Sequence, residues 1–371
     1  MSTAAISAPR EGGSGRPSTW VRSLEHLLLP AALLTLGLMV WHVLRGNWVA
    51  FDFQYAYWRA GHHVILGTSP YAWTQYQVVN KIIFVYPALS AVLFAPLSLI
   101  GRGTGSVLAM LLCIALVPLT LRLLGVRDKG VYAIALLWLP VYAAWQTANE
   151  TMFMVFGLAC VWRWRDRPLV AGFLTAAMIS LKPLLWPLIL WLLATRRWRA
   201  SASALIFGLV LNLAAWSVVG FGQISRYLNA ASADTTAAWR TGWGVPALLG
   251  HFGLGLSAGL VAMLALSAGL AGAVIYTAFV RRDELSALTL TVALALVSSP
   301  LLWSHYLALM LVPLALLRPR MHWVWVLPVL MWVSPLGMTV HTWQVLFSWA
   351  AGGAMFWVLA RHSGPDRQAS A

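Results

Sequence analysis

The stretch LLLPAALLTLGLMVWHVL, residues 27–44, carries no Asp, Glu, Lys or Arg. An apolar run of roughly 17–25 residues is the length at which an α-helix crosses the hydrocarbon core of a bilayer. Runs of this kind recur along almost the whole chain, which predicts an all-α, polytopic integral membrane protein. The first run is too long for a secretory signal peptide and no small-residue cleavage site follows it, so we interpret it as the first span.

The composition supports a membrane protein and argues against a nucleic-acid-binding one. Of the 371 residues 60% are hydrophobic and 9% charged, whereas soluble domains carry about 25% charged residues. The net charge of +15 is spread over short loops and forms no basic face. A basic excess of this kind is expected from the positive-inside rule, and tryptophans near the ends of apolar runs are typical of interfacial belts. The two cysteines lie inside apolar runs and provide no disulfide framework.

The charge distribution orients the chain. We expect disordered cytoplasmic tails at residues 1–25 and 362–371 and a single transmembrane domain, with about 10–12 spans, at 26–361. This layout places 7 of the 25 Lys and Arg residues outside and the other 18 inside, as the positive-inside rule requires. The seven outside are Arg45, Arg59, Lys81, Arg102, Lys182, Arg226 and Arg240.

The expected spans follow from the apolar runs. After the first span, we place crossings at about 105–121, 131–145, 150–162, 202–219, 255–279, 286–299, 323–340 and 345–360. Residues 169–194 are too short for two full spans and are expected to form a helical hairpin with Lys182 at its apex. Residues 83–100 are broken by Pro87 and Pro96, which predicts interfacial helices in the first outside loop.

One stretch stands out for chemistry: AFDFQYAYWRAGHHVILGTSPY, residues 50–71. It holds Asp52, the single acid between Glu25 and Asp128. Its aromatic neighbours should pack at the membrane surface, and a carboxylate held there needs a cavity, a cation or a ligand. Asp52 is therefore a candidate catalytic centre. The alternative is a juxtamembrane acid paired with Arg59 or with a helix N-terminus.

Three further polar positions interrupt apolar segments, and each has a structural alternative. Lys182 is placed to meet an anionic headgroup, or else its side chain reaches the interface as a snorkelling lysine. His305 is a candidate site residue or a satisfied packing histidine. Asn149 and Gln146 are candidate site residues or helix caps. The histidines show no metal-ligand spacing, so neither a metal nor a cofactor is predicted.

An ordered series of short motifs resembles glycosyltransferase family 87 over about residues 45–320. The chain departs from the usual family pattern at Gln146 and in the loop RTGWGVPALL. The resemblance implies a GT-C fold and a polyprenyl-phosphate-mannose-dependent α-mannosyltransferase of the bacterial cell envelope. The motifs are Asp52-x-x-Tyr55, Gly67, Pro70-Tyr71, Tyr86-Pro87, Asn149, Lys182-Pro183 and Ser299-Pro300-x-x-Trp303-x-His305.

The resemblance also implies a role for each matched residue. Asp52 would be the general base, and His305 its partner or a contact to the donor phosphate. Lys182 would bind that phosphate, with Arg59 and Arg102 as further candidates. The candidate substrate-binding residues are Tyr55, Tyr71, Tyr86, Asn149 and Trp303.

The chemistry agrees with this expectation. A polyprenyl phosphate leaves as an anion, so one base and some positive charge suffice, whereas a glycosidase uses two carboxyl groups. We expect an inverting transfer to a hydroxyl of a glycolipid or glycan, on the extracytoplasmic side of the bacterial plasma membrane. The partners are the polyprenyl-phosphate-sugar donor, that acceptor and membrane lipid, with no nucleic acid. Two alternatives stay open: transfer of another polyprenyl-linked sugar, such as arabinofuranose, and a lipid or solute transporter.

Overall fold

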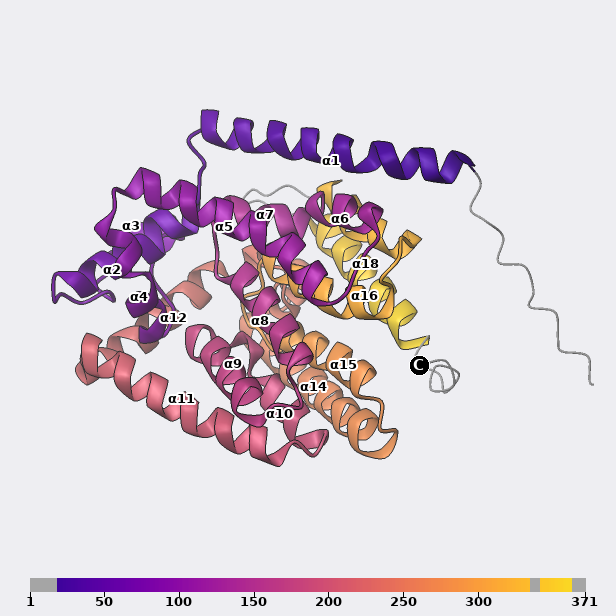
Figure 1. Ribbon diagram of the computed structural model, residues 1–371. Coiled ribbons are helices and arrows are strands. Elements are labelled where there is room, and N and C mark those ends of the chain that lie inside the picture. The colour runs from indigo at the N-terminus through magenta and orange to yellow at the C-terminus, as the bar shows by residue number, and fades with distance from the viewer. Residues whose placement is uncertain (1–18, 334–340, 362–371) are drawn as a thin grey trace, which may run out of the picture.

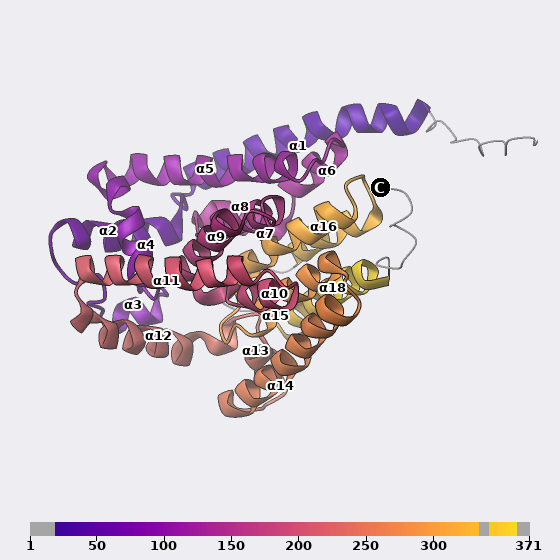
Figure 2. The same ribbon diagram turned by 60° about the horizontal axis from the view of Figure 1, so that its bottom comes forward.

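The computed structural model describes residues 19–333 and 341–361, and every regular element in these two ranges is a helix. The helices form one bundle, with α1 running along its edge in both views (Figures 1 and 2). Four helices are long and apolar enough to cross a membrane, which confirms the expected polytopic all-α class. They are α1 (Thr19–Arg45), α5 (Arg102–Leu123), α11 (Trp198–Val219) and α14 (Leu256–Ile275), the last continued by η6 (Tyr276–Val280).

The first connection between long helices is built from short elements. They are η1 (Phe53–Tyr57), α2 (Trp58–Ile65), α3 (Gln75–Val79), α4 (Ala88–Phe94) and η2 (Pro96–Leu99). Pro87 and Pro96 mark the starts of α4 and η2, since proline suits the beginning of a helix and not its interior. A Cβ at Gly61 would lie 2.8 Å from the backbone of Phe94, so a glycine is needed where α2 meets α4. No helix in this connection is long enough to span a bilayer.

Short helices fill the interior of the bundle. They are α6 (Lys129–Leu136), α7 (Leu139–Thr147), α8 (Thr151–Arg163), α9 (Pro168–Leu181), η3 (Pro183–Leu185), α10 (Pro187–Ala194), α15 (Glu284–Val297), η7 (Ser304–Met310) and α16 (Leu311–Leu317). The core includes the fully buried Trp138, Trp145, Trp191 and Trp325. The span expected at 131–145 is instead two helices, because Pro140 sits in the first turn of α7 and disfavours helical backbone just before it.

The remaining elements lie between α11 and α14 and in the C-terminal part of the chain. The connection from α11 to α14 contains η4 (Phe221–Gln223), α12 (Ile224–Ala238), η5 (Trp239–Thr241) and α13 (Val245–His251). The C-terminal part consists of η8 (Trp323–Val326), α17 (Leu327–Leu330), η9 (Met331–Val333) and α18 (Thr342–Arg361). Helix α1 begins at Thr19, inside the expected tail 1–25. The rest of that tail, the tail 362–371 and part of the span expected at 323–340 lie outside the described residues.

Loops that the charge layout assigns to one face do meet in space. Arg165 lies 3.3 Å from Glu284, and Arg197 binds Glu284 at 2.8 Å and Asp166 at 2.9 Å. These residues come from the connection between α8 and α9, the connection between α10 and α11, and the start of α15. The cluster therefore ties these three connections together.

Candidate active site

Asp52 follows the first long helix and is held against the end of α7 by backbone bonds. The amide of Ala50 donates to the carbonyl of Gln146 at 2.8 Å, and the Gln146 side chain donates to the carbonyl of Trp48 at 2.6 Å. Ala50 has a φ of 51°, which turns the chain sharply into the π-helix η1. These bonds bring the half-buried Asp52 beside residues 146–149.

Asn149 connects Asp52 to Tyr86. Its Nδ2 donates to Oδ2 of Asp52 at 2.6 Å and lies 3.4 Å from the hydroxyl of Tyr86. Its Oδ1 accepts from the amide and the hydroxyl of Thr151, at 3.2 and 2.9 Å. Asn149 is thus both the cap of α8 and the partner of Asp52. Asp52 forms no ion pair with Arg59 or any other residue in the described part of the chain.

Helix α9 ends before Lys182, whose backbone is extended. An extended backbone is favoured at this position because Pro183 follows it. The Lys182 side chain is 7% exposed, and its ammonium has no hydrogen-bond partner among the residues that the structure describes. The ammonium lies over two aromatic rings, 4.7 Å from the centroid of Tyr86 and 4.0 Å from that of Tyr306. Cation–π contacts of this kind partly replace hydration, but they leave all three donors free for an anion.

Three acids surround this lysine. Glu150, Asp52 and Asp234 all act on Lys182 through their charges, Glu150 most strongly. Glu150 is 1% exposed, and the nearby Ser90 hydroxyl donates to the carbonyl of Leu181 instead of to its carboxylate. The charge layout places all three acids outside, although only Asp52 was singled out from the sequence as a site residue.

Burial and charge act against each other at these groups. Burial raises the pKa of Asp52, while the hydrogen bond from Asn149 and the charge of Lys182 hold that pKa down. Burial lowers the pKa of Lys182, and the surrounding carboxylates oppose this. Burial raises the pKa of Asp234 to about 6. A carboxylate that keeps its charge in a poorly solvated site is a stronger base than an exposed one.

A cavity of about 310 Å³ opens beside Lys182. It collects side chains from the first loop, the end of α9, α12 and the segment after α15. His305 is buried next to it, with its ring 4.5 Å from that of Tyr306 and its Nε2 without a partner in the described chain. The cavity is lined by Val85, Tyr86, Lys182, Pro183, Leu184, Trp186, Ala231, Asp234, Thr235, Ser298, Ser299, Pro300, Leu301, Trp303 and Tyr306.

Most of the predicted site residues gather here. Asp52, Asn149, Tyr86 and Lys182 form one connected set. Tyr86, Lys182 and Trp303 line the cavity, and Asp52 and Asn149 are joined to it through Tyr86. His305 is buried beside the set. Tyr71 lies one step further out: its hydroxyl donates to the backbone carbonyl of Tyr86 at 2.9 Å, and its ring stacks on Trp216. Tyr71 therefore positions Tyr86 and does not reach the cavity.

Three predicted residues lie elsewhere. Arg102 stands 5.8 Å from the ring of Tyr55, and both belong to an exposed surface between η1 and α5. Arg59 is exposed on α2. Tyr55, Arg59 and Arg102 do not line the cavity that contains Lys182. Their elements, η1, α2 and the start of α5, turn these side chains outward. Sequence reasoning missed Glu150, Asp234 and Tyr306 as site residues.

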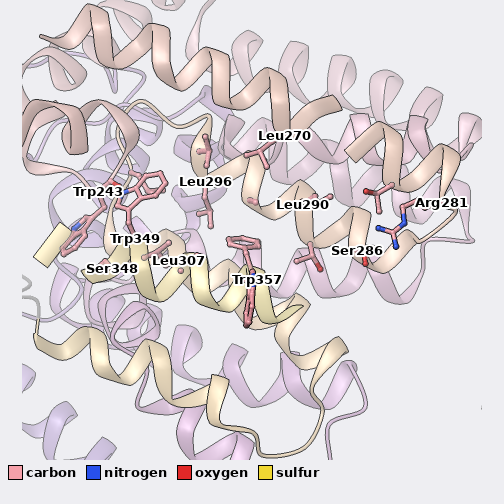
Figure 3. Close-up of a pocket in the computed structure, with 18 residues that line it drawn as sticks. Trp243, Leu270, Arg281, Ser286, Leu290, Leu296, Leu307, Ser348, Trp349 and Trp357 are labelled. Atoms are coloured by element: carbon pink, nitrogen blue, oxygen red, sulfur yellow. Dashed lines mark hydrogen bonds between the residues drawn. The ribbon is translucent and has the colours of Figure 1, made fainter. Parts of the chain in front are cut away.

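A second cavity, of about 430 Å³, runs along α14, α15 and α18 (Figure 3). It extends from Trp243 to Arg281, and apolar side chains form most of its wall. Leu302 lines it, while the adjacent Leu301 and Trp303 line the cavity beside Lys182. The amide of Trp243 donates to the carbonyl of Leu302 at 2.6 Å. The segment after α15 is therefore a common wall of the two cavities.

The fold and this site define a polytopic, all-helical membrane protein with a buried acid, amide and lysine beside a cavity. The model of glycosyltransferase family 87 matches residues 84–304, and the chain belongs to this family. The matched range includes Tyr86, Asn149, Lys182 and Trp303. Asp52 precedes it and His305 follows its last residue.

Two curated relatives match a similar share of the chain. A polyprenol-phosphate-mannose-dependent alpha-(1-2)-phosphatidylinositol pentamannoside mannosyltransferase of Mycolicibacterium smegmatis is 28% identical over 282 residues, covering 67% of this chain and 60% of the relative. A protein of the same name from Mycobacterium tuberculosis is 25% identical over 276 residues, covering 67% and 58%. The chain thus matches about 60% of the length of these relatives. No solved structure matches it.

Proposed function

We propose that this protein is a membrane mannosyltransferase that moves mannose from a polyprenyl-phosphate donor to a hydroxyl of a cell-envelope glycolipid or glycan. The observation that carries the proposal is the Asp52–Asn149 pair joined through Tyr86 to the free ammonium of Lys182, beside a sugar-sized cavity. Membership of family 87 and the names of the two relatives support the donor.

Asp52 is the general base in this proposal. Its carboxylate takes the proton of the acceptor hydroxyl as that oxygen bonds to C1 of the sugar and the bond from C1 to the phosphate oxygen breaks. Asn149 occupies Oδ2, which leaves Oδ1 for the incoming proton. A single displacement inverts the configuration at C1. The electron pair of the broken bond leaves on the polyprenyl phosphate, which needs no proton to depart.

Lys182 binds the donor phosphate. A buried ammonium with three free donors stabilises the negative charge that develops on the leaving phosphate, and a poorly hydrated site strengthens this effect. The rings of Tyr86 and Tyr306 hold the ammonium in place without consuming its donors. His305, buried beside Tyr306, is a second contact to the phosphate in this proposal.

The apolar cavity along α15 is proposed to hold the polyprenyl chain. It shares a wall with the cavity beside Lys182, so a lipid phosphate bound there can direct its tail along α14 and α18 (Figure 3). Because the acids and Lys182 belong to loops that the charge layout places outside, we propose an active site on the extracytoplasmic face of the plasma membrane.

The test is direct. Purified protein in lipid is supplied with polyprenyl-phosphate-mannose, separately with polyprenyl-phosphate-arabinofuranose, and with a phosphatidylinositol mannoside acceptor. We expect mannose transfer, and a product whose new linkage has the opposite anomeric configuration to the donor. Transfer of arabinofuranose alone, or uptake of either lipid across the bilayer without transfer, would overturn the proposal.

A further inference from the structure

The cavity beside Lys182 has an acidic wall that the mechanism above does not use. Asp234 lies in the third turn of α12, is 8% exposed and lines the cavity. It forms no hydrogen bond or ion pair with the part of the chain that the structure describes. Since a buried carboxylate without donors is costly, the arrangement indicates that a ligand supplies the missing hydrogen bonds.

The cation with the strongest charge effect on Asp234 does not supply these hydrogen bonds. Lys81 acts on Asp234 through its charge, but its ammonium donates to the hydroxyl of Thr241 at 2.6 Å and lies 4.7 Å from the ring centroid of Trp303. Lys81 therefore fixes the indole of Trp303 at the cavity wall and leaves the oxygens of Asp234 open. Lys182 and Asp52 are the other charged groups that act on Asp234.

The wall of the cavity thus carries two chemically different charged groups. Lys182 offers donors to an anion, whereas Asp234 offers acceptors and repels one. A glycosyl phosphate has the matching pattern, with an anionic group at C1 and a set of hydroxyl donors on the ring. Hydrogen bonds from hydroxyls to a carboxylate are short and strong, and a flat aromatic ring such as Trp303 provides an apolar surface for the CH groups of a sugar.

We propose that Asp234 recognises the transferred sugar: its carboxylate accepts hydrogen bonds from neighbouring hydroxyls of the donor hexose, whose ring lies against Trp303. This inference rests on the proposed function, because it needs a polyprenyl-phosphate sugar in the cavity. It adds that selection among sugars depends on Asp234 and not on Lys182. A site that hydrogen-bonds a hydroxyl discriminates strongly against an analogue that lacks or misplaces it.

The experiment compares wild type, Asp234→Asn and Asp234→Glu, with Ser232→Ala as a control at an exposed position of α12. For each variant kcat/KM is measured with polyprenyl-phosphate-mannose and with the glucose and galactose donors. The inhibition constant of sugar-free polyprenyl phosphate and the KM of the acceptor are measured alongside. We expect Asp234→Asn to lower kcat/KM for the mannose donor about 10- to 100-fold and to narrow the preference for that donor over the glucose donor, which differs at C2, and the galactose donor, which differs at C2 and C4. Inhibition by polyprenyl phosphate should be equal to or stronger than in wild type, because Asp234→Asn removes a charge that repels the phosphate. Ser232→Ala should behave as wild type.

Each other outcome decides against the inference. If Asp234→Asn keeps the wild-type selectivity among the three sugar donors, Asp234 does not recognise the transferred sugar. If inhibition by polyprenyl phosphate weakens as much as kcat/KM for the mannose donor falls, the effect of Asp234→Asn is due to charge or folding. If only the KM of the acceptor rises, Asp234 belongs to the acceptor site. Failure of the proposed function itself is visible in wild type, which would then transfer no mannose.

Discussion

Nδ2 of Asn149 donates to Oδ2 of Asp52 over 2.6 Å, between residues 97 positions apart in the chain. The bond fixes one oxygen of the carboxylate and orients the other. The clamp between Ala50 and Gln146 holds the two backbones together, so the pair does not depend on the side chains alone. A base whose orientation is set before the substrate arrives is the requirement for efficient proton transfer.

Replacing the base should abolish most of the activity. Asp52→Asn keeps the size of the side chain but removes the proton acceptor, and general-base catalysis contributes roughly 10²- to 10⁴-fold. We expect kcat to fall by about that factor, with little change in the KM of the donor. Transfer assays on protein purified in detergent measure the fall, and an unchanged thermal transition shows that the fold is retained. Wild-type rates in Asp52→Asn would exclude the base assignment.

Changing Asn149 should move the pH profile. In the proposed mechanism Asp52 acts in its ionised form, so activity should be lost as the pH falls through its pKa, which burial raises above the ordinary value. Asn149 and Lys182 both lower that pKa. Asn149→Asp keeps an acceptor for Thr151 but removes the donor and adds a like charge. The acidic limb of kcat/KM should therefore move upward by about one to two pH units.

The control for this shift is Thr151→Val, which loses the hydroxyl bond to Asn149 but keeps the donor to Asp52. Its acidic limb should stay in place. If the two variants shift together, the effect belongs to the cap of α8, and if neither shifts, Asn149 does not tune the base.

Lys182 should affect the donor and not the acceptor. Lys182→Gln removes the positive charge, and we expect the KM of the donor to rise about 10- to 100-fold while that of the acceptor is unchanged. Initial rates at varied donor and acceptor concentrations separate the two constants.

Loss of the lysine also leaves Glu150 buried without its main opposite charge, a change that can destabilise a protein by about 3–5 kcal/mol. The double variant with Glu150→Gln removes both charges and should regain the thermal stability lost in the single variant, without regaining donor use. Recovery of the donor KM in the double variant would show that Lys182 only balances charge.

The main features of the site were predictable from the sequence because each breaks a strong local pattern. Asp52 is an acid in an aromatic segment, and Lys182 is a charge followed by proline in an apolar run. Arg59 and Arg102 were assigned by charge alone. Whether a charged side chain on a helix faces a cavity or lipid depends on how that helix packs in three dimensions. Asp234 was recognised as an outside acid, but its approach to Lys182 depends on the packing of α12, which no local pattern encodes.

The apolar cavity along α15 provides a test of where the donor chain binds. Gly352 and Gly353 of α18 line it, and a Cβ at either would meet nothing within 4 Å. Gly352→Leu therefore fills the cavity without a clash, whereas Gly272→Leu on α14 adds the same side chain at a position outside that cavity, again with nothing within 4 Å. If the polyprenyl chain binds there (Figure 3), Gly352→Leu should raise the KM of a full-length donor about tenfold or more, as expected when roughly 1.4 kcal/mol of apolar contact is lost. A donor with a chain too short to reach α18 should be affected less, and Gly272→Leu should behave as wild type. An equal effect of Gly352→Leu on the full-length and the short donor would show that the polyprenyl chain binds elsewhere.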